Sequence, residues 1–488
     1  MTSPYSVANQ RLKGVRRSPS KPVSPARFSS AYLVGICGSG MKALAELLVG
    51  LGWKITGSDT CEPNPTLRAM QERGLRVHSG HDDLYLPSDF DVLVYSPAVG
   101  PDNPERRAAV QRGICQMSYS QMLGHLMRDR IGVSIAGTHG KSTTTAMAAT
   151  ILSDSNLSAS AVVGAELCGR NKSGWAGTGE HLVVESCEYQ RSFLDIRPRL
   201  AAILSIEPDH FDCYTTFDEM RAAFARYAEQ VEDGGVLLIP SRCSLSAEAA
   251  RGTQAELVTF SDQPGADWWA TDPRATATGT RFRVFFRGDY FSEINLAVPG
   301  RHNVLNALAA IAVSHHAGAS ADEVRTSLQG FVGIRRRFER LGSWRGVTLI
   351  DDYAHHPTAI RATLETAREI FGRRRIWCAF QPHQVSRTQT LLNEFSQSFE
   401  LADEILVLPV YAARENLRDE PTMVSQELAS RAGIEGRSAR FCGSLDRVVT
   451  TLEDEARPGD VLITMGAGDI DQVQHEFARR LQRHRAAG

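Results

Sequence analysis

The hydrophobic pattern of the chain restarts three times, each time with an apolar segment that leads into a polar or glycine-rich turn and then into a helix-forming stretch. The apolar segments are AYLVGI at 31–36, GVSIAG at 132–137 and GVTLIDDY at 346–353. Strands that alternate with helices in this way are typical of parallel sheets covered by helices. The pattern therefore predicts an α/β protein with three domains.

The final third of the chain repeats this alternation and predicts a doubly wound sheet. Its expected strands are 375–380, 404–408 and 460–465, and its expected helices are 357–371 and 471–483. A chain of 488 residues is also longer than one ordinary hydrophobic core can organise. The predicted domains are a Rossmann-like N-terminal domain at 31–130, a central P-loop ATPase-like α/β domain at 131–333, and a C-terminal Rossmann-like domain at 334–488.

The composition changes this picture little and indicates a soluble, cytoplasmic protein. Hydrophobic residues make up 42% of the chain and charged residues 23%, and no apolar stretch approaches the roughly 20 residues that a membrane helix needs. A net charge of −2 gives no general attraction to nucleic acid or to an anionic membrane. The nine cysteines include no CxxC pair, which indicates neither a disulfide framework nor a structural zinc site. We expect no nucleic-acid or membrane partner, and a monomer or weak homodimer.

Residues 1–30 differ from the rest of the chain. They contain lysines and arginines but no acidic residue, together with several serines and prolines. Such a composition cannot bury enough apolar surface to fold, so we predict a disordered basic tail. The segment has no apolar stretch of the kind that a secretory signal requires.

The first predicted domain carries a nucleotide-binding pattern. Gly38, Gly40 and Ala43 form GxGxxA between a strand and an apolar helix, and Asp59 follows 21 residues after Gly38. Glycines allow the backbone to approach a pyrophosphate at a helix N-terminus, and the aspartate can accept hydrogen bonds from ribose hydroxyls. The pattern indicates a nucleotide diphosphate without distinguishing NAD from a UDP-sugar. A helix that merely packs tightly on its sheet is the alternative interpretation.

The second predicted domain carries a phosphate loop. The strand 131–136 leads into GTHGKS at Gly137–Ser142, and the helix 143–152 follows. Backbone N–H groups and the helix dipole would surround the phosphates of ATP, Lys141 would neutralise the terminal ones, and Ser142 could bind Mg²⁺. The strict Walker pattern requires a glycine at the position of Ile135, so this loop is a shortened GxxGKS form. A purely structural turn is the alternative.

Two further strands of the second domain end in polar residues. HLVVES ends at Glu185, and LAAILSIEPDH ends with Asp209 and His210. Because the carboxyl ends of parallel strands share one edge of the sheet, these side chains should lie near the phosphate loop. A carboxylate and an imidazole there suit Mg²⁺ between ATP and a second substrate. Alternatively, His210 is a structural histidine, and Glu185 and Glu188 are solvated surface acids.

Eight ordered segments now give a family resemblance. They are GTHGKSTTT, ESCEYQRSFL, IEPDHFD, GRHNVLNALAA, RRRFERLG, DDYAHHPTAI, AFQPHQVSRT and MGAGDI. In this order they closely resemble the Mur ligases of peptidoglycan synthesis, and in particular the alanine-adding branch. The resemblance runs from about Ala31 to the C-terminus and leaves only the tail outside it.

The resemblance implies a substrate and a role for each matching residue. The first domain would bind UDP-N-acetylmuramate through Gly38, Ser39, Gly40, Met41, Asp59 and Ser96. ATP would be bound by Gly137, Thr138, His139, Gly140, Lys141, Ser142, Thr143, His302, Asn303, Arg337 and Asp351. Within that set, His302 and Asn303 would face adenine, Arg337 the phosphates and Asp351 the ribose.

The remaining implied residues concern L-alanine, Mg²⁺ and catalysis. His355, His383 and Arg387 would surround L-alanine, and Ser142, Glu185 and His210 would bind Mg²⁺. Lys141, Glu185, His210, His355 and Arg387 would carry catalysis. ATP would phosphorylate the sugar carboxylate, and the amine of L-alanine would attack the acyl phosphate. Closure of the domains would assemble this site.

The chain departs from the family pattern twice. No lysine occurs between His210 and Gly234, so we predict no carbamylated lysine at the metal site. Gln384 also replaces the arginine that follows His383 in many alanine-adding members, which leaves Arg387 as the partner for the incoming carboxylate. If the third-domain residues were merely structural, His355 and His356 would cap the helix at Pro357, and 335–337 would be a solvated linker.

Three other functions remain open from the sequence. A recycling ligase would attach a whole peptide to the same sugar. An NAD-dependent oxidoreductase would use the glycine pattern of the first domain but leave the phosphate loop unexplained. A scaffold regulated by a nucleotide would bind ATP without turnover.

Overall fold

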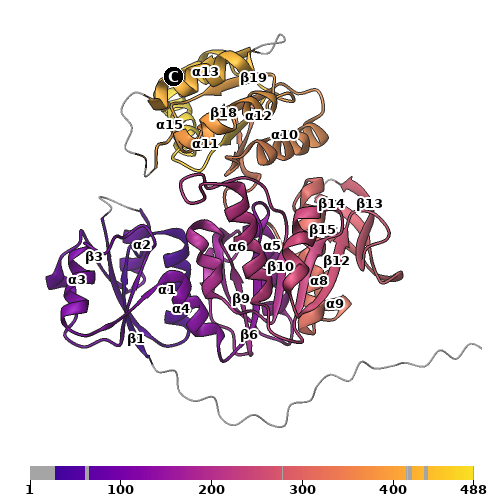
Figure 1. Cartoon of the computed structure of the whole chain (residues 1–488). Coiled ribbons are helices and arrows are strands. Elements are labelled where there is room, and N and C mark those ends of the chain that lie inside the picture. Colours follow the sequence, from indigo (N-terminus) through magenta and orange to yellow (C-terminus); the bar gives the residue numbers. More distant parts are fainter. Residues whose placement is uncertain are drawn as a thin grey trace, which may run out of the picture.

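Three separate sheets organise the chain in the computed structural model (Figure 1). The structure describes residues 28–60, 65–276, 279–413, 415, 420–433 and 438–486. Most of the predicted basic tail, residues 1–27, lies outside the described residues. None of the described helices has the length and apolar character needed to cross a membrane.

The first sheet has five parallel strands in the order β3-β2-β1-β4-β5. The strands are β1 Ser30–Val34, β2 Lys54–Asp59, β3 Arg76–Ser79, β4 Val92–Tyr95 and β5 Cys115–Ser118. The helices are α1 Ser39–Gly50, α2 Pro65–Glu72, α3 Pro104–Gln111 and α4 Tyr119–Met127, with a short 3-10 turn at Asp83–Tyr85. Helix α1 begins four residues before the predicted start at Ala43, directly after the Gly38 turn. Asp59 is the last residue of β2 and therefore faces this turn.

The middle sheet has ten strands in the order β15-β14-β13-β12-β11-β10-β6-β9-β7-β8. Its strands are β6 Ile131–Ala136, β7 Ser160–Leu167, β8 Lys172–Trp175, β9 His181–Glu185, β10 Leu200–Ile203, β11 Val236–Pro240, β12 Glu256–Ser261, β13 Trp268–Thr276, β14 Gly279–Phe286 and β15 Asp289–Leu296. Strands β13, β14 and β15 pair antiparallel and extend one edge of the sheet, a feature that the hydrophobic pattern did not predict.

The helices of the middle domain include two that are buried almost all round. Helix α5, Lys141–Asp154, and helix α8, Arg301–Ala317, are rich in buried alanines, whose small side chains allow the two helices to pack together in the core. The other helices are α6 Phe217–Glu229, α7 Ser244–Ala249 and α9 Ala321–Gln329, with 3-10 turns at Tyr189–Asp195 and Ala250–Gly252. Because α5 is fixed on both sides, the phosphate loop at its N-terminus is held rigidly.

The third sheet has six strands in the order β16-β17-β21-β18-β19-β20, and only its edge strand β16 is antiparallel. The strands are β16 Glu339–Trp344, β17 Val347–Asp352, β18 Ile376–Phe380, β19 Glu404–Val407, β20 Ser438–Phe441 and β21 Val461–Met465. The helices are α10 Pro357–Phe371, α11 Val385–Thr390, α12 Leu392–Gln397, α13 Glu420–Ala432, α14 Leu445–Glu455 and α15 Gln472–Ala486. Helix α10 has the predicted bounds because His356 caps it and Pro357 occupies its first turn.

The first and middle domains share a hydrophobic core. Val162, Leu182 and Val184 of the middle sheet belong to the same buried cluster as the first-domain helix α1. The Glu46 carboxylate of α1 also accepts hydrogen bonds from the backbone N–H groups of Ser173 (2.8 Å) and Gly174 (2.9 Å). The third domain has its own core clusters and lies across the middle domain (Figure 1). Its side-chain hydrogen bonds to the middle domain join α10 and α11 to the segment after β10.

Candidate active site

The phosphate loop Gly137–Ser142 connects β6 to α5, as predicted, and the helix begins at Lys141 rather than at Thr143. Gly140 has a φ of +79°, and a Cβ atom there would lie only 2.4 Å from the amide oxygen of Asn306. Only glycine adopts this conformation without strain at so close an approach. Asn306 was not predicted as a site residue, although the NVLN spacing on α8 puts it on the same face as Asn303.

Lys141 is held by its own loop and by a buried acid. Its ammonium donates to the carbonyl oxygens of Gly137 (2.5 Å) and Thr138 (3.2 Å) and to Glu188 (3.0 Å). Burial alone would lower the pKa of Lys141, but Glu188, Cys187 and Glu185 together outweigh burial and raise that pKa. The ammonium is therefore charged and available to the phosphates of a nucleotide.

Glu188 is fully buried, so the interpretation of this residue as a solvated surface acid is wrong. Burial would raise the pKa of its carboxyl, but Lys141 and His210 together lower it. His210 Nε2 lies 3.2 Å from a Glu188 oxygen, and Tyr214 donates to the Glu188 carbonyl oxygen at 2.6 Å. The sequence gives no direct signal for this role, because the burial of an acid after a strand depends on the tertiary packing.

Ser142 and Glu185 meet at the edge of the sheet, as the strand ends predicted. The Ser142 hydroxyl donates to Glu185 Oε1 at 3.0 Å, and the backbone N–H of Gly164 donates to Glu185 Oε2 at 2.7 Å. The nearby Glu188 carboxylate contributes a further oxygen, Oε2, which lies 2.9 Å from the Lys141 ammonium. Hard oxygen ligands of this kind fit Mg²⁺. His210 lies beside Glu188 rather than beside Glu185.

The residues expected near adenine lie at the start of α8. The Asn303 side chain donates to the Pro299 carbonyl oxygen at 2.6 Å and accepts from Asn306 at 3.1 Å. Burial, with a further contribution from Arg337, lowers the pKa of His302 to about 4. His302 is therefore neutral at physiological pH, and its predicted contact with adenine stays a prediction.

In the third domain Arg336, rather than Arg337, holds Asp351. Its Nε lies 3.1 Å from Asp351 Oδ2, and its other nitrogens donate to the carbonyl oxygens of Gly466 and Gly468. Asp351 is buried and also accepts from Thr464 at 2.6 Å. The description of 335–337 as a solvated linker is therefore wrong for Arg336. Burial raises the pKa of Asp351 to about 6, and its predicted contact with ribose stays a prediction.

Arg337 has its guanidinium carbon 5.0 Å from the centre of the Tyr353 ring. Its charge contributes to the lowered pKa of His302, which belongs to the middle domain. The predicted role of Arg337 towards the phosphates of ATP stays a prediction.

The three residues expected around L-alanine are close together. The rings of His355 and His383 have their centres 6.1 Å apart, and Arg387 donates to the His383 carbonyl oxygen at 3.1 Å. His355 Nδ1 lies 2.8 Å from the Tyr353 carbonyl oxygen, so it carries the proton and leaves Nε2 as the acceptor. The alternative that His355 and His356 merely cap α10 applies only to His356, which accepts from the Thr358 backbone at 3.3 Å.

Arg387 reaches out of its own domain. Its Nε lies 2.6 Å from Asp209 Oδ1, and the side chains are only 3% and 5% exposed. Burial would raise the pKa of Asp209, but the guanidinium beside it holds that pKa well below its ordinary range. Asp209 precedes the predicted metal ligand His210. This ion pair therefore brings the residues expected around L-alanine next to the edge of the sheet that carries the phosphate loop.

The predicted UDP-sugar residues surround the turn after β1. The Asp59 carboxylate accepts from the backbone N–H of Cys37 at 2.8 Å and so holds this turn. Met41 belongs to the hydrophobic core, so only its backbone remains for a ligand. A Cβ at Gly40 would lie 3.0 Å from the Tyr119 ring, so tight packing explains this glycine. The remaining predicted residues of this group are Gly38, which precedes α1, Ser39, which begins it, and Ser96, which follows β4.

Gly35 was not predicted as part of this turn. It has a φ of +79°, and a Cβ there would lie 2.9 Å from Ser96. A glycine directly after an apolar strand was the available signal.

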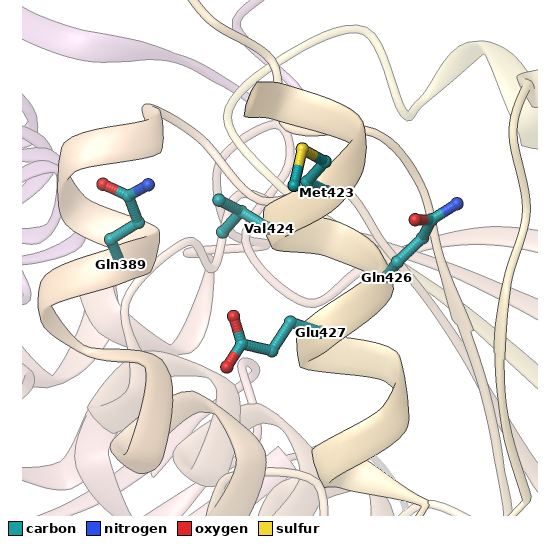
Figure 2. A pocket seen from close by; sticks show the side chains of 5 residues that line it. All are labelled: Gln389, Met423, Val424, Gln426 and Glu427. Atoms are coloured by element: carbon teal, nitrogen blue, oxygen red, sulfur yellow. The ribbon is translucent and has the colours of Figure 1, made fainter. Parts of the chain in front are cut away.

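A separate pocket lies between α11 and α13. Figure 2 shows it lined by Gln389 on one helix and by Met423, Val424, Gln426 and Glu427 on the other. None of these residues was predicted as a site residue, and the set includes only one ionisable side chain. This pocket therefore lacks the charged groups that nucleotide activation requires.

Comparison with known proteins agrees with this geometry. Residues 30–131 match the Mur ligase family catalytic domain, 135–314 the Mur ligase middle domain, and 336–468 the Mur ligase glutamate ligase domain. The chain belongs to the Mur ligase family. Members of this family are ATP-dependent ligases, which explains the phosphate loop and the three domains of this Mur ligase.

Individual relatives cover almost the whole Mur ligase chain. A UDP-N-acetylmuramate–L-alanine ligase of Salinibacter ruber is 39% identical over 93% of this chain and 96% of its own length. The solved UDP-N-acetylmuramate–alanine ligase of Thermotoga maritima is 27% identical, with a TM-score of 0.76 and coverage of 93% and 99%. A murein peptide ligase of Psychrobacter arcticus is 26% identical, with a TM-score of 0.68 and coverage of 93% and 98%.

Proposed function

We propose that this Mur ligase joins L-alanine to the carboxylate of UDP-N-acetylmuramate at the expense of ATP, in the cytoplasmic synthesis of peptidoglycan precursors. The observation that carries the proposal is the 39% identity to an L-alanine ligase over nearly the full length of both chains. The buried pair of Asp209 and Arg387 supports it, because the pair joins Arg387, which is expected to bind L-alanine, to the domain that carries the phosphate loop.

The first step transfers the terminal phosphoryl group of ATP to the sugar carboxylate, which is a poor electrophile until it is activated. Lys141 is placed to neutralise the phosphate charge in this step, because its ammonium is charged and lies within the loop. Glu188 fixes the ammonium from the opposite side. Ser142, Glu185 and His210 are the residues that would hold Mg²⁺, which would offset the negative charge of the reacting phosphates when bound.

The second step joins the amine of L-alanine to the acyl phosphate and releases inorganic phosphate. Arg387 would bind the carboxylate of L-alanine through Nη2, while Asp209 accepts from Nε and the His383 carbonyl oxygen accepts from Nη1. His355 would accept a hydrogen bond at Nε2, because its Nδ1 proton is already donated to the Tyr353 carbonyl oxygen. Burial lowers the pKa of His355, which keeps the ring neutral for this contact.

A panel of acceptors tests the proposal directly. Purified protein is incubated with ATP, Mg²⁺ and UDP-N-acetylmuramate, and phosphate release is followed with single amino acids and with a murein tripeptide. We expect release to depend on L-alanine and on the UDP-sugar. A preference for the tripeptide would instead indicate a peptide-recycling ligase, which the likeness to the Psychrobacter arcticus protein makes the second candidate.

A further inference from the structure

A group of three side chains joins the middle and third domains outside the set of residues assigned above to Mg²⁺. His139 comes from the phosphate loop, Glu207 from the segment after β10, and His356 from the residue before α10. One nitrogen from each ring and one Glu207 oxygen all lie within 4.8 Å of one another. His139 Nε2 is 3.3 Å and His356 Nδ1 is 3.9 Å from Glu207 Oε2.

The ring nitrogens of this group are incompletely satisfied. The Nε2 atoms of His139 and His356 are both buried. His139 Nε2 faces the Glu207 carboxylate, whereas His356 Nε2 makes no hydrogen bond within the described part of the chain. His356 is only 5% exposed. A buried polar atom without a partner costs about 1–3 kcal/mol, so the unpaired His356 Nε2 at this junction requires an explanation.

Two imidazoles and one carboxylate are the ligand set of many zinc sites. With zinc–ligand bonds of about 2.1 Å, neighbouring ligand atoms in a tetrahedral site lie about 3.4 Å apart. The separation of 3.3 Å between His139 and Glu207 already meets this requirement. The 3.9 Å separation requires His356 Nδ1 to move closer and to give up its 3.3 Å hydrogen bond from the Thr358 backbone. We propose that His139, Glu207 and His356 bind one divalent transition-metal ion of the zinc class between the two domains.

The surroundings of the group suit such an ion. Burial lowers the pKa of His356 to about 4, so its ring is neutral and can act as a ligand at physiological pH. Burial would raise the pKa of Glu207, but hydrogen bonding by His139 helps to hold it at about 2, so the carboxylate is ionised. The Thr358 hydroxyl donates to Glu207 Oε2 at 2.7 Å and orients this carboxylate from outside the ligand set.

An ion at this position would connect the phosphate loop to helix α10. Because its ligands come from both domains, the ion binds the closed arrangement and stabilises it against opening. Opening is needed to release product, so zinc should inhibit turnover. The binding itself depends only on the three side chains and requires neither the proposed substrates nor ATP.

Calorimetric titration of the nucleotide-free, full-length protein with Zn²⁺ tests the site. The variants are Glu207→Gln and His356→Asn, because asparagine preserves the cap of α10. We expect each variant to bind one equivalent of Zn²⁺ fewer than the wild type, or to bind that equivalent at least about tenfold more weakly. The exposed His475 serves as the matched control, and His475→Asn should retain the wild-type stoichiometry.

A second group, Cys187, Glu188 and His210, could also hold a metal ion, and the same titration distinguishes it from the proposed site. Any zinc bound there remains in both variants, so only the equivalent that they lose belongs to the proposed site. Thermal unfolding without metal checks that each variant folds. If one variant does not fold, the other still tests the site. Equal stoichiometry and affinity in the wild type and a folded variant, or no zinc binding by the wild type, would overturn the proposal.

Discussion

Substitution of Asp209 by asparagine tests the link between the residues expected to bind L-alanine, which lie in the third domain, and the middle domain, which carries the phosphate loop. Asp209 and Arg387 are joined at 2.6 Å, and both side chains are at least 95% buried. Asparagine has nearly the same shape and still offers an oxygen acceptor, but it leaves the Arg387 charge buried without a counter-charge. The variant therefore changes the charge of the junction while preserving its packing.

The magnitude follows from the burial of the pair. Removal of one partner from a buried ion pair costs about 3–5 kcal/mol, and the retained acceptor puts this case at the lower limit, about 3 kcal/mol. Because the two residues belong to different domains, the cost favours separation of the domains, in which Arg387 is hydrated. A cost of about 3 kcal/mol corresponds to about a hundredfold loss in the population of the closed state relative to the open one.

Steady-state phosphate release at varied L-alanine measures this loss. We expect kcat/KM for L-alanine to fall about a hundredfold in Asp209→Asn, while binding of the UDP-sugar to the first domain changes little. Asp322→Asn is the matched control, because Asp322 also pairs with an arginine but is 90% exposed. Such exposed pairs contribute little. A kcat/KM for Asp209→Asn within about threefold of the control would refute the reasoning.

Three further predictions concern other parts of the molecule. Lys141→Ala should abolish acyl-phosphate formation while calorimetry still detects UDP-sugar binding, because the two sites lie on different domains; loss of both would contradict this division. Gly164→Ala would put a Cβ atom 2.4 Å from a Glu185 oxygen, so it should displace that carboxylate and raise the Mg²⁺ concentration needed for half-maximal activity. Burial lowers the pKa of His316 from 6.5 to about 4. The folded protein keeps this ring neutral, whereas the unfolded chain protonates it below about pH 6.5. Up to about 3 kcal/mol of the free energy of unfolding is therefore lost as the pH falls from 6.5 towards 4. Urea unfolding across this range should show a weaker pH dependence for His316→Gln than for the exposed control His475→Gln.

The sequence predicted the features that depend on neighbouring residues. The strand before the phosphate loop, Ile131–Ala136, has the predicted bounds because it is a continuous apolar run, and α10 has the predicted bounds because Pro357 marks its start. The meeting of Ser142 and Glu185 was also predictable, since Ser142 comes after β6, Glu185 ends β9 and these two strands pair in parallel. Such features follow from periodicity and from the rules of sheet topology.

The missed features depend on residues far apart in the chain. Asp209 and Arg387 are separated by 178 positions, and neither residue alone indicates its partner. Arg336 and Arg337 are chemically identical neighbours, and a φ of +59° at Arg336 helps to decide which side chain meets Asp351. The acid Glu188 likewise differs from a surface acid only through the packing around it.

The shared core of the first and middle domains determines how this molecule can move. The glycine at 174 brings its backbone so close to α1 that an added Cβ would lie 1.9 Å from the Ala43 carbonyl oxygen. Sliding or rotation at that junction would expose apolar surface, whereas the third domain meets the middle domain through polar and ionic pairs that water can replace. We therefore expect one hinge rather than two, at the segment that leads into β16. In this expectation the turn after β1 and the phosphate loop keep a fixed relative position, and only the third domain moves.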